Sequence, residues 1–196
     1  MPCRPATSPI LERKYMSNSK AIEDMVAKEE IRNLVGQYCR AADRNDLDLL
    51  RSLYWEDALD EHGYNKSNTA KEFIDRIPEF EGINCVQHNV TSQVITVDGD
   101  EAEGESYVIA YHNFMTADGP AVMICGGRYL DRYTRKNGEW RISHRKCTTD
   151  WGHEFAVPNL DPPTTFTDGN IAVGKKSGND VSYGFFKYLT RGNRVV

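Results

Sequence analysis

The chain has 196 residues, of which 39% are hydrophobic and 27% charged, and its formal net charge is −5. This length suits one globular domain with extensions and allows a substantial hydrophobic core. The negative charge offers no basic surface for nucleic acid, the mean hydropathy of −0.61 disfavours a membrane protein, and five scattered cysteines without a Cys-x-x-Cys pair disfavour a disulfide framework or a zinc knuckle.

Residues 1–18 are rich in Pro and Ser and are expected to form a flexible N-terminal arm. They lack the apolar segment of a signal peptide, and Met16 is an alternative start to Met1. Because the cysteines are expected to be reduced thiols, a cytoplasmic location is predicted.

Helical signals extend from residue 19 to about residue 80. Apolar side chains recur there at spacings of three to five, as one buried helical stripe would require: Ile22, Met25, Val26, Ile31, Val35, Tyr38 and Cys39. Asp46 is expected to cap a short second helix. Thr69-Ala-Lys-Glu72 has the form of a capping box that opens a third helix, which Pro78 ends, and residues 58–62 are expected to form a short strand.

The pattern then changes to strands rich in Val, Ile, Tyr and Thr. Turn signals at Asp98-Gly99, at 118–120 and at Asn137-Gly138 separate four expected strands, at 84–97, 101–116, 121–135 and 139–149. Strands of this length must twist and bend, for which Gly104, Gly126 and Gly127 are candidates. The expected fold class is α+β, a cone-shaped barrel in which three N-terminal helices pack into a strongly curved antiparallel sheet.

Three segments are therefore expected: the arm at 1–18, the α+β barrel domain at 19–151, and a C-terminal extension at 152–196. The extension carries Pro158, Pro162, Pro163 and the aromatic side chains of 183–188. It is expected to cover a pocket, with 152–163 across the entrance, or to contact another subunit.

Tyr38, Asp43 and His88 form the most informative set of polar residues. Tyr38 and Asp43 lie five residues apart where the first helix runs out, and His88 lies near the start of the strand region. Imidazole transfers protons near neutral pH, a carboxylate fixes its tautomer and stabilises its cation, and a phenol can donate to a developing oxyanion. These three groups suffice for an acid–base site that needs no cofactor.

Structural roles are the alternatives for each residue. His88 can be a hydrogen-bonded strand residue, Asp43 can cap a turn, Tyr38 can belong to the core, and Arg145 can be a surface cation. Residues 60–62 are expected at a solvated rim. No metal-binding triad is expected among the histidines, which include His62, His144 and His153.

Two longer stretches resemble a known family. Residues 30–50, followed by Tyr54-Trp-Glu-Asp-Ala, resemble the opening of SnoaL-like proteins in the nuclear transport factor 2-like superfamily, and 133–142 resembles that family's last hairpin. The resemblance covers about residues 24–155. It implies the cone fold, whereas the same fold hosts enzymes, transport factors and non-catalytic subunits.

Within that superfamily the site resembles three kinds of elimination enzyme. Bile acid 7α-dehydratases imply catalytic roles for Tyr38, Asp43 and His88. Scytalone dehydratases imply the Asp–His pair, a pocket role for His112, and a place for Tyr129 where they carry an asparagine. Hexachlorocyclohexane dehydrochlorinases imply the same pair together with Arg145.

The resemblance extends past the last expected strand. Trp151-Gly-His-Glu-Phe155 is similar to the sequence that leads into the cover of the scytalone dehydratase site, so Trp151 is also expected at the substrate.

The predicted function is a cofactor-independent dehydratase acting on a hydrophobic cyclic small molecule such as a polyketide, terpenoid, steroid or aromatic catabolite. The pocket is expected to be apolar, with lining from Val35, Phe73, Ile77, Val90, Val108, Ala110, Ile124 and Trp151. The alternatives are an isomerase or cyclase using the same proton abstraction, a non-catalytic binding protein, and the small subunit of a dioxygenase. A homotrimer is expected, with a dimer as the alternative, and neither nucleic acid nor a membrane as partner.

Overall fold

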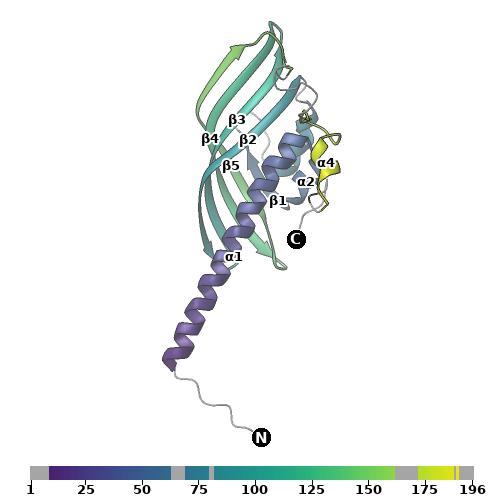
Figure 1. Cartoon of the computed structure of the whole chain (residues 1–196). Coiled ribbons are helices and arrows are strands. Elements are labelled where there is room, and N and C mark those ends of the chain that lie inside the picture. Colours follow the sequence, from purple (N-terminus) through teal and green to yellow (C-terminus); the bar gives the residue numbers. More distant parts are fainter. Residues whose placement is uncertain (1–8, 63–68, 80–81, 162–171, 188, 190–196) are drawn as a thin grey trace.

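The computed structural model describes residues 9–62, 69–79, 82–161, 172–187 and 189. A long first helix is followed by a short helix, a strand and a third helix, and then by four long strands and a short C-terminal helix (Figure 1). The helices are α1 Pro9–Arg44, α2 Leu47–Ser52, α3 Ala70–Arg76, the 3₁₀ turn Ile77–Glu79, and α4 Val181–Phe185; the strands are β1 Tyr54–Glu61, β2 Ile83–Asp98, β3 Glu101–Thr116, β4 Gly119–Lys136 and β5 Glu139–Ala156.

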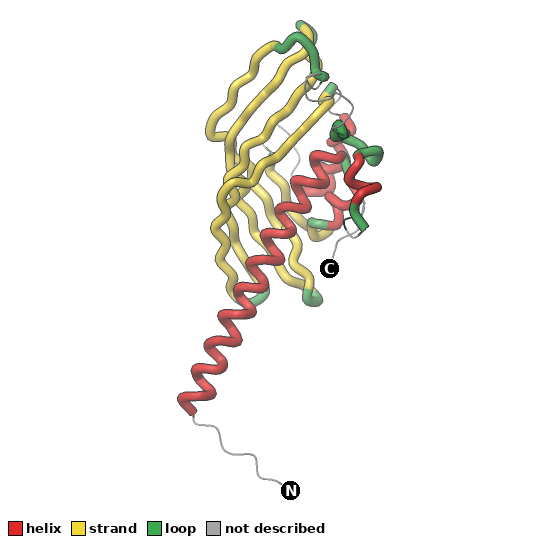
Figure 2. Tube along the Cα trace, viewed as in Figure 1, coloured by secondary structure: helices red, strands yellow, loops and turns green. Residues whose placement is uncertain are grey.

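The five strands form one sheet in the order β1-β5-β4-β3-β2. Strands β2 to β5 are an antiparallel meander, and β1 joins the edge of the sheet in parallel to β5. The sheet curves, and the C-terminal part of α1 lies along it (Figure 2). The predicted α+β architecture, helices packed against a strongly curved sheet, is confirmed.

The helix starts predicted from capping residues are also confirmed. The Asp46 side chain accepts a hydrogen bond from the Leu49 amide at 3.1 Å, and so caps α2. Thr69 and Glu72 form both hydrogen bonds of a capping box at the start of α3.

Three boundaries differ by several residues from the sequence-based expectation, and one of them is the start of β1, at Tyr54 instead of residue 58. The first helix begins at Pro9 instead of residue 19, and pairs such as Ser19–Glu23 and Lys20–Asp24, one turn apart, support its polar N-terminal part. The last strand continues to Ala156 instead of ending at 149, because it remains paired with β4 as far as Ala121. Residues 152–156 therefore belong to the sheet.

One irregularity in the pairing of β4 with β5 coincides with two glycines. The pairing register shifts between Gly126 and Gly127. A Cβ atom on Gly127 would lie 1.9 Å from the carbonyl oxygen of Thr148, so the two backbones can approach this closely only without a side chain. An irregularity of the sheet therefore lies at two of the three glycines predicted as bend points.

The hydrophobic core lies between α1, α2 and the inner face of the sheet. Its enclosed residues include Ile31 and Leu34 of α1, Leu50 of α2, and Trp140 and Ile142 of β5. This core fixes the last turns of α1 against the sheet and thereby positions the polar groups at the end of that helix. Within the described residues, no helix has both the length and the apolar character needed to span a lipid bilayer.

Candidate active site

Asp43 and His88 are in direct contact. The ring Nδ1 of His88 lies 2.7 Å from Oδ1 of Asp43, and the His88 backbone amide donates to both carboxylate oxygens at 3.2 and 3.3 Å. Asp43 lies in the last turn of α1 and His88 in β2, the edge strand, so the carboxylate also satisfies an amide that has no neighbouring strand on that side. The structure thus brings together two of the residues predicted from sequence.

The contact with Asp43 determines which nitrogen of His88 is available. Since a carboxylate accepts, neutral His88 carries its proton on Nδ1 and presents a lone pair on Nε2. No residue in the described part of the chain forms a hydrogen bond with Nε2. The side chains of His88 and Asp43 remain 15% and 11% exposed, so this nitrogen can meet a small molecule.

His112 of β3 is an aromatic neighbour of His88. The two imidazole rings meet edge to face, with centroids 5.7 Å apart. Burial lowers the pKa of His112 to about 4, and the adjacent His88 adds to the effect while Asp43 opposes it. His112 is therefore neutral at physiological pH, and its buried Nδ1 has no partner among the described residues. His112 thus lies beside the dyad but is not among the residues that line the adjacent pocket, and its predicted contact with substrate stays a prediction.

A pocket of about 1080 Å³ opens beside the dyad. Its walls come from the end of α1, the first half of β2, two residues of β3 and the C-terminal segment: Asp43, Arg44, Asn45, Ile83, Asn84, Cys85, Val86, Gln87, His88, Tyr111, Asn113, Leu160, Asp161, Val173, Gly174, Lys175, Lys176 and Ser177. None of the eight apolar side chains predicted as its lining is among them. Val35, Val108 and Ala110, for example, are packed into the core. The pocket wall is more polar than expected because it follows a sheet edge and a helix end.

Tyr38 lies deeper, inside the cone. It is 2% exposed, and its hydroxyl is 3.2 Å from Nε2 of His62 instead of reaching the Asp43–His88 pair. Burial raises the pKa of Tyr38 well above its ordinary value, although Arg145 opposes this effect. The phenol is therefore un-ionised and engaged in a second polar cluster.

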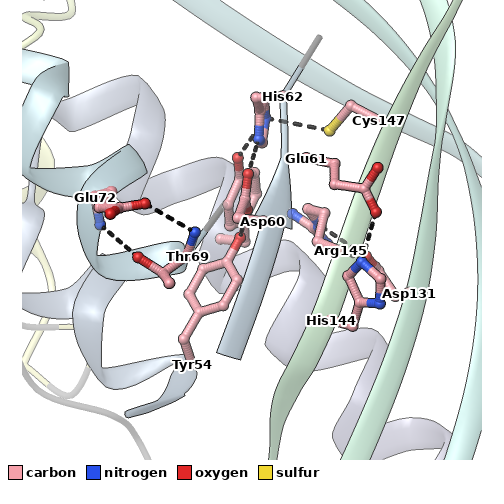
Figure 3. A network of polar contacts seen from close by, with 11 residues as sticks. Tyr54, Asp60, Glu61, His62, Thr69, Glu72, Asp131, His144, Arg145 and Cys147 are labelled. Carbon is pink, nitrogen blue, oxygen red and sulfur yellow. Dashed lines mark hydrogen bonds and ion pairs between the residues drawn. The ribbon is translucent and has the colours of Figure 1, made fainter. Parts of the chain in front are cut away.

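That second cluster is built around Asp60 and His62 (Figure 3). The fully enclosed carboxylate of Asp60 accepts a hydrogen bond from the Tyr54 hydroxyl at 2.7 Å and contacts Nδ1 of His62. Cys147 Sγ lies 3.2 Å from Nε2 of His62, and the ring of Phe73 stacks on the imidazole at 4.0 Å. The described residues therefore include two Asp–His pairs, and of these two the Asp43–His88 pair lines the pocket.

The expectation that residues 60–62 form a solvated or rim segment is wrong for Asp60, which is enclosed, whereas the side chains of Glu61 and His62 are 44% and 22% exposed. The alternation of a strand would have indicated that Asp60 and His62 face the same side as Ala58. The partners could not be foreseen, because β1 meets Cys147 only through its parallel pairing with β5.

Arg145 does not reach the pocket. It is fully enclosed, its guanidinium binds Asp131 through two hydrogen bonds of 2.7 and 2.6 Å, and Tyr133 donates to the same carboxylate at 2.7 Å. The guanidinium carbon lies 4.0 Å from the ring centroid of Tyr38 and 4.1 Å from that of Tyr129. Arg145 and Tyr129, both predicted to bind substrate, thus lie in the interior.

Trp151 is also outside the pocket. It is 45% exposed on β5, and its indole covers the backbone of Gly126 so closely that an added Cβ would lie 2.3 Å from it. Within the described residues, no cluster of three or more His, Cys, Asp or Glu side chains has an arrangement that could hold a metal ion.

Comparison with known proteins adds a family and a fold. A sequence profile of the SnoaL-like domain matches residues 23–146. γ-Hexachlorocyclohexane dehydrochlorinase of Sphingobium indicum is 22% identical over an alignment of 148 positions, which covers 72% of this chain and 92% of that enzyme.

Two solved structures from Novosphingobium aromaticivorans share the fold. A candidate scytalone dehydratase is 22% identical, with a TM-score of 0.59 over 71% of this chain and 94% of that chain. The beta subunit of a candidate aromatic-ring-hydroxylating dioxygenase is also 22% identical, with a TM-score of 0.53 over 65% of this chain and 91% of that chain.

Proposed function

The chain belongs to the SnoaL-like domain family, and on that premise we propose that it is a small-molecule-converting enzyme of the lyase or isomerase type. The observation that carries the proposal is the 2.7 Å contact between Asp43 and Nδ1 of His88, which leaves Nε2 unengaged beside an open pocket. A base held in one tautomer by a carboxylate is the arrangement that proton abstraction requires.

In the proposed reaction, Nε2 of His88 removes a proton from a carbon next to a carbonyl or another activating group. Asp43 stabilises the imidazolium that forms. Where a hydroxyl lies β to that carbon, His88 returns its proton to the departing oxygen, and the net reaction is a syn dehydration. We favour this outcome because the relatives named above include a dehydrochlorinase and a candidate dehydratase, both names for elimination chemistry.

The developing oxyanion needs a hydrogen-bond donor. Tyr38 is the proposed donor, a role that requires the substrate to reach beyond the pocket lining to the enclosed phenol. Its contact with His62 sets a second condition on that role. When His62 is neutral, Nε2 accepts the phenol proton. When His62 is protonated, Nε2 donates to the phenol oxygen and leaves the hydroxyl free to donate to the substrate. Arg145 and Tyr129 hold the Tyr38 ring in place in this proposal instead of contacting the substrate.

The proposed substrate is a cyclic small molecule with a largely apolar body, and no cofactor takes part. Without a leaving group, the same abstraction would give isomerisation or cyclisation. A non-catalytic role is the second candidate, because the dioxygenase beta subunit shares the fold. The enzyme is favoured over the non-catalytic role because Asp43 binds Nδ1 of His88 and leaves Nε2 available as a base.

We further propose that the protein acts in the cytoplasm as a homotrimer, with a dimer as the alternative. The barrel domain would associate through the outer face of its sheet, and the segment after β5 would serve the pocket or the contact.

Deuterium exchange tests the proposed proton abstraction. The protein would be incubated in deuterated water with a panel of cyclic ketones and their β-hydroxy derivatives, and followed by nuclear magnetic resonance. We expect deuterium at the carbon next to the carbonyl, or loss of the β-hydroxyl, at a rate that His88→Ala reduces to background. If wild type and His88→Ala give equal rates on every compound that reacts, the proposed base is wrong.

A further inference from the structure

The C-terminal strap, defined here as residues 172–186, closes one side of the Asp43–His88 pocket. Its last part, α4, lies beside the C-terminal end of α1 (Figure 1). Asp180 fixes the strap: its carboxylate accepts from the Lys175 amide at 2.7 Å and from the Ser182 amide at 3.0 Å, and it forms an ion pair with Arg44 at 3.3 Å. Asp180 is 4% exposed, so this anchor is part of the folded domain.

A second set of contacts holds α4 itself. The Tyr183 hydroxyl donates to Asp46 at 3.2 Å, and Arg40 donates to Ser182 at 3.3 Å. The Arg40 guanidinium also lies 5.0 Å from the centroid of the Tyr183 ring. These anchors are Arg40 and Arg44 of α1 and Asp46, the N-cap of α2. The strap therefore has a defined position relative to Asp43, which lies between them in the chain.

This position places Lys175 and Lys176 in the pocket wall together with the dyad. Lys176 is the more enclosed of the two, and its Nζ donates to the carbonyl oxygen of Ile83, the first residue of β2, at 3.4 Å. The ammonium also acts on the histidine pair: after burial and the charge of His88, it is among the groups that lower the pKa of His112. Lys176 therefore lies within electrostatic range of the proposed reaction centre.

Not every charged group around the pocket is paired. Arg44 is paired with Asp180, Asp43 is bound to His88, and Asp161 is exposed at the rim. Within the described part of the chain, Lys176 has no carboxylate partner, and its one hydrogen bond is long. Burial lowers the pKa of Lys176, since a half-buried ammonium is poorly hydrated. A bound anion would supply the missing partner.

We propose that Lys176 binds a carboxylate of the substrate in the Asp43–His88 pocket, so that the substrate is an anionic small molecule carrying its reactive carbon acid on an apolar body. The inference rests on the proposed function for the identity of the site. A charge-assisted hydrogen bond at Lys176 would fix one end of the molecule and present the carbon to Nε2 of His88. Lys175, exposed at the same wall, would add a weaker attraction.

A matched pair of probes tests the charge requirement. 1-Naphthoate and 1-naphthamide have nearly the same shape, and only the first is anionic at neutral pH. Their affinities would be measured by calorimetry for wild type, Lys176→Gln, and the control Lys20→Gln. Lys20 is an exposed lysine near the other end of α1, paired with Asp24, and its replacement changes the net charge equally.

We expect wild type and Lys20→Gln to bind naphthoate more tightly than naphthamide, and Lys176→Gln to lose about tenfold in naphthoate affinity, as a charged hydrogen bond would give. Naphthamide affinity should be the same in all three proteins. Equal affinity of wild type for both probes, no binding of naphthoate, or equal naphthoate affinities of Lys176→Gln and Lys20→Gln would each overturn the proposal. These binding results do not depend on turnover, so they are separate from the deuterium-exchange test of His88.

Discussion

Asp43 holds His88 at two points, accepting hydrogen bonds from the ring Nδ1 at 2.7 Å and from the backbone amide at 3.2 Å. The first contact selects the tautomer of the imidazole, and the second ties the edge of β2 to the end of α1. One carboxylate thus sets the orientation of the proposed base and satisfies an edge amide of the sheet.

Asp43→Asn should keep the fold and lose most of the activity. The amide oxygen can still accept from the backbone amide of His88, but its NH₂ group can stabilise the opposite tautomer, and it cannot support an imidazolium. We expect kcat/KM to fall about 10²- to 10⁴-fold. Nitrogen chemical shifts of His88 should show a proton on Nδ1 in wild type and a loss of that preference in the variant.

A double-mutant comparison tests whether the pair acts as one unit. His88→Ala should be as inactive as Asp43→Asn, and the double variant scarcely worse than either. Additive losses in kcat/KM would show that the two residues contribute independently, which contradicts the dyad.

His112 should make the protein less stable in mild acid. Its pKa is about 4 in the folded protein, below the ordinary value of 6.5, because burial disfavours its charged form. Between these pH values the unfolded chain binds more protons than the folded one, so the free energy of unfolding falls as pH falls from 6.5 towards 4. His112→Gln should remove this part of the pH dependence in urea unfolding. In nuclear magnetic resonance spectra of the wild type, the His112 ring should still be neutral at pH 5.

Two carboxylate–histidine pairs that include residues of β1, Asp60–His62 and Glu61–His144, offer a matched comparison of burial (Figure 3). His62→Ala would leave the enclosed Asp60 without its ring partner, and we expect a loss of about 3 kcal/mol in unfolding free energy. His144 pairs with Glu61 at 2.8 Å on the exposed side, so His144→Ala should cost less than about 1 kcal/mol. Equal losses in urea unfolding would contradict the structural role assigned to Asp60–His62.

Local sequence signals predicted the features that depend on short segments. The caps at Asp46 and Thr69 and the pairing irregularity at Gly126-Gly127 follow from nearby residues. The meeting of Asp43 with His88 followed from family resemblance, since nothing local links a helix end to a strand 45 positions later.

The remaining features depend on strand register. Arg145 is enclosed because Asp131 lies opposite it on β4, and Asp60 is enclosed because β1 pairs in parallel with β5. The polar character of the pocket depends on where residues 173–177 return to α1. No sequence period encodes such long-range pairings, so the enclosure of Arg145 and Asp60 could not be predicted from the sequence.

Two glycines should respond oppositely to the same substitution. Gly127→Ala would place a methyl group 1.9 Å from the Thr148 carbonyl oxygen, so the backbone must shift, at a cost of about 1–3 kcal/mol or more. Gly36 lies exposed in α1 with nothing within 4 Å of an added Cβ, and Gly36→Ala should stabilise the protein by about 0.5–1 kcal/mol. Urea unfolding of both variants measures the difference, and a loss in Gly36→Ala would contradict the helix assignment there.

The proposed trimer should depend on the outer face of the sheet. Ile109, Gly126 and Trp151 are aligned across β3, β4 and β5, and the two side chains flanking the glycine are 40% and 45% exposed. Val94, Tyr107 and Phe155 are also exposed. Large apolar side chains gathered on one face are typical of a subunit contact, since burying them removes apolar surface from water.

Light scattering at micromolar concentration should therefore give three times the chain mass for wild type, whereas Ile109→Asp should give a single chain mass. Met25→Asp, which places the same charge on an exposed position of α1, is the control and should remain trimeric. A dimer would retain the interface with a different symmetry, whereas a wild-type monomer, or dissociation by Met25→Asp but not by Ile109→Asp, would remove the outer face of the sheet from the assembly.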